Sequence, residues 1–65
     1  MNYVKVDLYL SVENKPYVFQ DSFQDKRAAY DEAETLILVD KRNRVLLVGG
    51  SWHEYLYRGC PQLKR

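Results

Sequence analysis

Hydrophobic residues near the start of the chain fall on every second position. The apolar members are Val4, Val6, Leu8, Leu10 and Val12, and between them stand Lys5, Asp7, Tyr9 and Ser11. A period of two predicts a half-buried β-strand. Residues 13–16 form a polar turn with Asn and Pro, and residues 17–23 alternate again. We therefore expect an antiparallel hairpin, in which the face that carries the polar members meets water.

From residue 24 onward the apolar spacing changes to that of a helix. One apolar stripe, at i, i+4, i+7 and i+8, is formed by Ala29, Ala33, Leu36 and Ile37. Ser22 and Asp25 have the spacing of a capping box, so the pattern predicts a helix from about Gln24 to about Ile37. Residues 36–39 are all apolar, and they suit either the last turn of this helix or the start of a strand.

A second run of four apolar residues spans positions 45–48. Such runs are typical of a strand that is buried on both faces, so we expect this strand to be central in the sheet. The run leaves open which alternate pair faces the core, Val45 and Leu47 or Leu46 and Val48.

The last predicted element is a short helix over about residues 52–58. Residues 49–50 are glycines that end the preceding strand, and residues 51–54 have the spacing of a capping box. Gly59 stands where a helix commonly has its terminal glycine. We expect residues 61–65 to be a frayed tail. The side of this helix that docks on the sheet would carry Trp52, Tyr55 and Leu56.

These elements define a single small domain over residues 1–65. Their order is β-β-α-β-α, or β-β-α-β-β-α if residues 36–39 are extended. Either order belongs to the α+β class, with helices on one face of a small antiparallel sheet. A domain of this size buries only about 60% of the surface that its unfolded chain exposes. A well-packed core or a partner must therefore supply its stability.

Charge divides unevenly along the chain. Residues 1–40 contain four basic and eight acidic side chains, which gives a net charge of −4. Residues 41–65 contain six basic side chains and Glu54 alone, which gives +5, so the two parts sum to the net charge of +1. A molecule with an acidic and a basic part has two oppositely charged regions, each of which can attract a partner or a second copy of the same chain.

The sequence lacks the residue patterns that several classes of function require. Cys60 is the one cysteine, so no internal disulfide forms, and with His53 it makes at most half a zinc site. No third group is evident that would orient the histidine for a catalytic thiol. Residues 49–51 lack the Lys-Ser/Thr pair of a P-loop and the third glycine of a dinucleotide motif. We expect no enzyme, no catalytic residue, no metal and no cofactor.

The start of the chain lacks a basic stretch followed by an apolar run, which argues against a signal peptide. No apolar run is long enough to cross a membrane. We therefore expect a cytoplasmic protein that does not bind membranes.

Two sets of surface residues are the predicted contact sites. The basic and aromatic set comprises Lys41, Arg42, Arg44, His53, Tyr57 and Arg58. The acidic set, on the outer side of the first helix, comprises Asp31, Glu32 and Glu34. Arginine and tyrosine are enriched in protein–protein hot spots. Basic surfaces with aromatic side chains also bind nucleic acids.

A protein-binding module that acts through a charged face is the first functional hypothesis, because the chain is too small to enclose a typical substrate pocket. In size and in its lack of motifs it resembles the very small single-domain proteins that phages encode. That resemblance implies an inhibitor of a host or defence nucleic-acid enzyme. The alternative is a small nucleic-acid-binding protein that uses the basic C-terminal part. A homodimer, with the acidic helix of one copy against the basic turn of another, is a third hypothesis.

Overall fold

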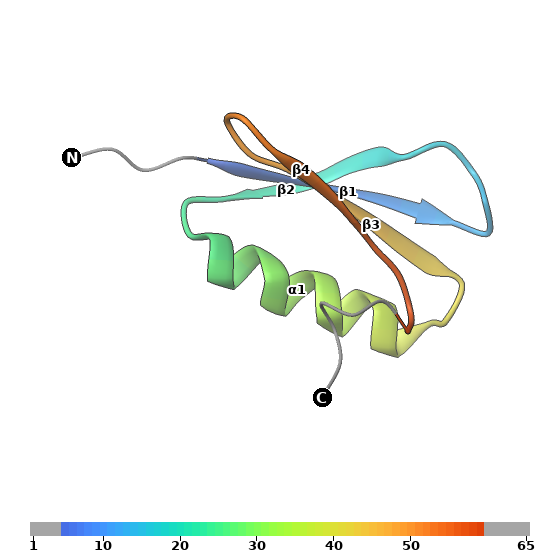
Figure 1. Cartoon of the computed structure of the whole chain (residues 1–65). Helices are drawn as coiled ribbons and strands as arrows, with labels where there is room; N and C mark the ends of the chain where they lie inside the picture. Colours follow the sequence, from blue (N-terminus) through green and yellow to red (C-terminus); the bar gives the residue numbers. More distant parts are fainter. Residues whose placement is uncertain (1–4, 60–65) are drawn as a thin grey trace.

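The computed structural model describes residues 5–59, which form four strands and one helix. The elements are β1 (Val6–Val12), β2 (Val18–Phe23), α1 (Lys26–Val39), β3 (Asn43–Val48) and β4 (His53–Leu56). The strands make one antiparallel sheet in the order β2-β1-β3-β4, and α1 lies across one face of it (Figure 1). The expected α+β class, the N-terminal hairpin and the central place of β3 are confirmed.

A tight turn joins β1 to β2. The backbone N–H of Lys15 donates to the carbonyl of Val12 at 3.1 Å. The two residues between them, Glu13 and Asn14, have φ values of 54° and 65°. Two central residues with positive φ are the mark of a type I′ turn, whose twist matches that of the strands it joins. The polar turn expected over 13–16 therefore closes the hairpin.

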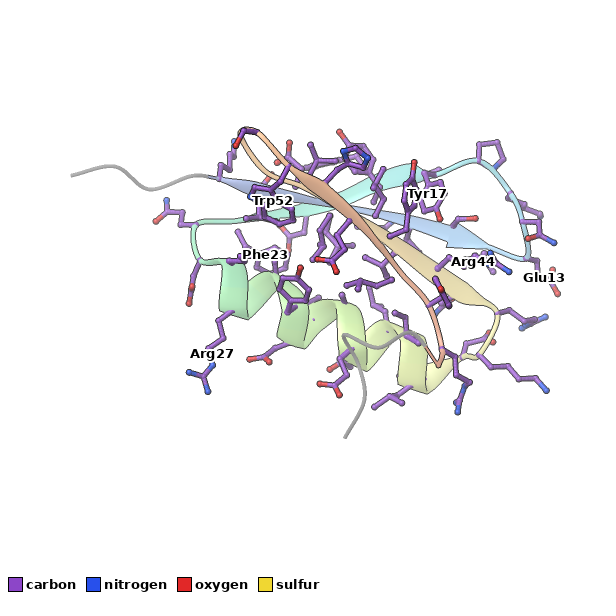
Figure 2. The ribbon with its side chains drawn as sticks, in the orientation of Figure 1. Glu13, Tyr17, Phe23, Arg27, Arg44 and Trp52 are labelled. Atoms are coloured by element: carbon purple, nitrogen blue, oxygen red, sulfur yellow. The ribbon has the colours of Figure 1, made fainter. Side chains whose placement is uncertain are left out.

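A bulge in β2 changes which of its side chains face the helix. Leu8 pairs with Asp21, but the next residue of β1, Tyr9, pairs with Phe19. Gln20 is therefore the extra residue of a β-bulge. Phe23 pairs with Val6 on the helix side, and Figure 2 shows its ring between the sheet and the helix. Phe19 consequently lies on the opposite face.

The helix begins later than predicted, and its cap is a different residue. Asp25 is the N-cap, and its carboxylate accepts a hydrogen bond from the backbone N–H of Arg27 at 3.1 Å. Ser22, the predicted cap, belongs to β2, and its hydroxyl donates to Asp7 at 2.7 Å. The helix begins at Lys26, two residues after the predicted start at about Gln24, because the backbone of Asp25 is still extended.

At its C-terminal end the helix extends through Val39, so residues 36–39 are helical. The side-chain amide of Asn43 donates to the carbonyl of Leu36 at 2.8 Å. The backbone N–H of Asp40 reaches the same carbonyl. These donors satisfy a carbonyl that the end of a helix otherwise leaves without a partner. Asn43 is 8% exposed, so the first residue of β3 also fixes the end of α1.

The core lies between the helix and the face of the sheet that it covers. Ala29 and Ala33 bring α1 close to the sheet because they are small, and Ile37 fills the space beyond them. On β3 the pair that faces the core is Val45 and Leu47. The other fully buried apolar side chains are Val6, Leu8 and Leu56.

The predicted second helix over 52–58 is wrong, because His53–Leu56 form strand β4 and no residue from 52 to 58 is helical. Val48 pairs with His53, and the backbone N–H of Gly49 donates to the carbonyl of Trp52 at 2.8 Å, which closes a β3–β4 hairpin. Leu56 pairs with Val45 and is fully buried, so this side chain reaches the core as part of the sheet and not from a helix docked on it. Gly59, with a φ of 91°, therefore follows a strand.

The residues of the expected capping box have other partners. The carboxylate of Glu54 accepts a hydrogen bond from the hydroxyl of Tyr30 on α1.

A Cβ atom added to Gly49 would lie 2.2 Å from Nε1 of Trp52, so the indole folds directly over this glycine. The ammonium of Lys26 lies 4.5 Å from the centre of the same indole. The glycine at 49 is thus explained by the approach of Trp52.

Candidate functional site: the open face of the sheet

The face of the sheet opposite α1 is covered by no described element, and we call it the open face (Figure 1). Strand pairing arranges its side chains in three rows that run across the strands. The acidic row is Ser22, Asp7, Val48 and His53. The aromatic row is Phe19, Tyr9, Leu46 and Tyr55. The basic row is Ser11 and Arg44.

Aromatic side chains on the open face contact one another edge to face. The rings of Tyr9 and Phe19 have centroids 5.7 Å apart and planes at 74°. The ring of Tyr55 contacts those of Tyr17 and His53, with centroids 5.8 and 5.9 Å away. Such contacts hold the rings in place. Phe19 and Tyr55 are nevertheless 52% and 53% exposed. The result is an ordered aromatic surface in contact with solvent.

Charges on this face stand at its two ends. Arg44 is exposed, and no carboxylate of residues 5–59 lies within ion-pair distance of it. Burial raises the pKa of the neighbouring Tyr17, while Arg44 acts in the opposite direction. At the other end, Asp7 accepts the Ser22 hydrogen bond and is half-buried. The open face therefore has a positive end and a negative end with aromatic side chains between them.

The predicted basic set is dispersed. Lys41 and Arg42 lie in the loop between α1 and β3, whereas Arg44 and His53 lie at opposite ends of the open face. Tyr57, which is 46% exposed, and Arg58 follow β4. A hollow of about 470 Å³ brings together three of the six, since it is lined by Glu13, Asn14, Lys41, Arg42 and Arg44.

Within this hollow Arg42 is already paired. Its guanidinium bonds the carboxylate of Asp40 at 2.9 Å and also pairs with Glu13 of the hairpin turn. The hydrogen bonds from Arg42 lower the pKa of Asp40 to about 2. The same two carboxylates raise the pKa of Arg42. Part of the positive charge that is segregated in the sequence is therefore balanced in the fold by acidic residues from the first 40 positions.

The predicted acidic set lies on α1, away from the open face. Asp31 and Glu32 are exposed, and Glu34 is half-buried. The helix α1 covers one face of the sheet, whereas the basic row belongs to the opposite face (Figure 1). Cys60 and the predicted tail over 61–65 lie outside the described residues.

Sequence reasoning missed the open face as a site. The prediction of a polar face considered one strand, with Lys5, Asp7, Tyr9 and Ser11. The neighbouring strands add the apolar and aromatic members of the aromatic row. One signal was present, because the apolar run 45–48 indicates a strand with apolar side chains on both faces.

Within residues 5–59, no three His, Cys, Asp or Glu side chains group as metal ligands. The one described helix is neither long nor apolar enough to cross a membrane. Comparison with protein-family models, with curated proteins and with solved structures found no match. The candidate site of the described residues is therefore the open face. Its side chains can make apolar contacts at the centre and ionic contacts at two oppositely charged ends.

Proposed function

We propose that this chain is a non-enzymatic protein-binding module whose binding surface is the open face. The observation that carries the proposal is the aromatic row, which is ordered by ring contacts yet about half exposed at Phe19 and Tyr55. An exposed apolar patch with a polar rim is a common mark of a protein interface. Tyrosine and arginine are also the residue types that dominate binding energy in such interfaces.

The balance of charge favours a protein partner over a nucleic acid. The open face carries Asp7 as well as Arg44, and Asp7 would repel a phosphate backbone. Arg42 is occupied by two carboxylates, so the hollow offers less free positive charge than its sequence suggests. The edge-to-face contacts also occupy ring edges and faces that base stacking would need. Inhibition of a host or defence enzyme, as in phage-encoded proteins, stays a prediction that rests on size.

Site-specific photo-crosslinking tests this proposal. A photoreactive amino acid is placed at Tyr55 on the open face or, as a control, at Leu38, an exposed apolar position on α1. We expect irradiation in expressing cells to give a discrete protein adduct from position 55 and none from position 38. The adduct should disappear when Phe19 is replaced by Ala, because Phe19 belongs to the same row.

Two outcomes would contradict the proposal. Adducts that shift on nuclease treatment would favour the nucleic-acid alternative, which also predicts binding that weakens steeply with salt. Equal adducts from positions 55 and 38 would mean that the open face has no special role. Circular dichroism of each labelled protein confirms that the substitution leaves the fold intact.

A further inference from the structure

We propose that the protein bound on the open face is a second copy of this chain. The two copies form a face-to-face dimer in which Arg44 of each pairs with Asp7 of the other. This inference rests on the proposed function and names its partner. It differs from the dimer expected from sequence, in which the acidic helix met the basic turn.

The register of the strands makes the open face self-complementary. Asp7 and Ser11 are four residues apart on β1, about 13 Å along the strand, and Tyr9 stands halfway between them. Arg44 is the partner of Ser11 on the neighbouring strand β3, and the two strands are about 4.8 Å apart. The aromatic row is therefore equidistant from the acidic and basic rows.

A two-fold axis along the aromatic row exchanges the two ends. This axis lies between the two sheets and runs across their strands. Rotation by 180° about it places the acidic row of one copy over the basic row of the other. Asp7 then lies over the position of Ser11 of the second copy, which is already covered by its own chain, and beside the exposed Arg44. The two packed sheets are about 10 Å apart. The long arginine side chain spans the remaining offset of one strand. Both ion pairs form at once, because a two-fold interface repeats each contact.

The centre of this interface is apolar. In the two-fold arrangement each member of the aromatic row meets its own counterpart, so Leu46 packs on Leu46 and Tyr55 on Tyr55. Two sheets that pack through such side chains form a sandwich with a core of its own.

The apolar run in β3 supports a covered open face. Val45 and Leu47 are fully buried against α1, whereas Leu46 and Val48 on the other side of the strand are only half-buried. A strand with four consecutive apolar residues is typical of burial on both faces, and a second copy would supply the missing cover.

The area of the open face places this interface at the small end of the range. Four strands of 4–7 residues span about 19 Å across the strands and about 20 Å along them. Such a face supplies less than the roughly 800 Å² per partner of a standard interface, as in weak or transient complexes. A domain of this length nevertheless gains from association, because a single small core contributes only about 3–5 kcal/mol.

Charge reversal with exchange tests the pairing directly. Arg44→Asp leaves both ends of the face negative, and Asp7→Arg leaves both ends positive. Each variant alone should dimerise about tenfold or more less tightly than the parent chain, as measured by sedimentation velocity, because like charges then face each other. An equimolar mixture of the two should form a heterodimer, because each negative end then meets a positive one.

Two controls keep the result interpretable. Arg27→Asp reverses an arginine on α1 that points away from the sheet, and it should leave the dimer unchanged (Figure 2). Asp7 holds the Ser22 hydroxyl, so the folding of Asp7→Arg is checked by circular dichroism. Leu46→Arg, at a half-buried position in the aromatic row, provides an independent variant that should be monomeric.

Three results would overturn the inference. The first is that the parent chain has the mass of a monomer at all concentrations up to the millimolar range. The second is that Arg27→Asp disrupts the dimer as strongly as Arg44→Asp does. The third is that the mixture of Arg44→Asp and Asp7→Arg remains monomeric although both variants fold. If the parent is monomeric and position 55 still crosslinks to a different protein, only the identity of the partner fails. If position 55 crosslinks to no protein, the proposed function fails with it.

Discussion

The two faces of this sheet are built from the same strands and differ in what covers them. Leu46 and Leu47 are neighbours on β3, yet Leu47 is fully buried under α1 and Leu46 is half-buried on the open face. The covered face is uniformly aliphatic at its centre, whereas the open face combines tyrosine, phenylalanine and histidine with a charge at each end. Aliphatic side chains there hold the fold, while the amphipathic rings suit a surface that alternates between water and a partner.

The largest expected effect is a difference in the stability lost when Leu47 or its neighbour Leu46 is replaced by Ala. Leu47→Ala opens a cavity against α1 and should cost about 2–5 kcal/mol. This is comparable with the whole stability of a domain of this length, so the variant should be largely unfolded at 25 °C. Leu46→Ala should cost about 1 kcal/mol in dilute protein, because only part of its side chain is buried. Urea unfolding followed by circular dichroism measures both. Equal losses would erase the distinction between the faces.

A second comparison uses protein concentration. If the open face is covered by a second copy, the melting temperature of the parent chain should rise with concentration, whereas that of Leu46→Arg should not. Scanning calorimetry at several concentrations measures this. A melting temperature that is independent of concentration in both proteins would contradict the dimer.

The β3–β4 turn should respond more strongly than its exposed position suggests. Gly49→Ala places a Cβ atom against the Trp52 indole and should cost about 1–3 kcal/mol, with a shift in tryptophan fluorescence. In a Trp52→Ala background the same substitution should cost much less, because the clash is gone. Additive effects of the two substitutions would exclude the indole as the reason for this glycine.

The junction of α1 and β3 gives a smaller effect. Asn43→Ala removes the amide that bonds the Leu36 carbonyl and should cost about 1 kcal/mol. Asn43→Asp should cost more, because it places a negative charge beside the negative end of the helix dipole. Urea midpoints at pH 7 compare the two variants. A harmless Asn43→Asp would show that this contact contributes nothing.

The smallest effect concerns Asp40, which lies on neither face. Its pKa falls from the ordinary 3.8 to about 2 in the folded chain. A lowered pKa means that ionised Asp40 stabilises the fold above about pH 4, and that this contribution is lost as the pH falls toward 2. Asp40→Asn should therefore be slightly less stable than the parent at pH 7 and equally stable at pH 2. A difference that persists at pH 2 would assign it to another cause.

The elements with a strong period could be predicted from sequence. The alternation over 4–12 and the stripe through Ala29, Ala33 and Ile37 located the first strand and the helix, because each has a single buried face. The segment 51–58 was misread because its local signals, a serine three residues before a glutamate and a following glycine, fit a helix. Cross-strand pairing of Leu56 with Val45, a contact between two segments that local signals do not relate, determined the strand.

The candidate site was harder to predict for the same reason. The aromatic row combines residues from four strands, and its composition depends on the bulge at Gln20, which moves Phe19 to the face opposite Phe23. Period-two reasoning places both phenylalanines on one face. The prediction of a basic contact surface also treated Arg42 as free, because its pairing with Glu13 joins two turns that are 29 residues apart.

The most direct test observes the open face in the dimer itself. A sample that mixes isotope-labelled and unlabelled copies allows NMR to detect contacts between copies only. We expect intermolecular contacts from the methyl groups of Leu46 and Val48 to aromatic rings of the second copy, and none from the exposed methyl groups of Leu38 and Val39 on α1. Intermolecular contacts confined to Leu38 and Val39, or no contacts at millimolar concentration, would contradict the central claim that the open face is the interaction surface.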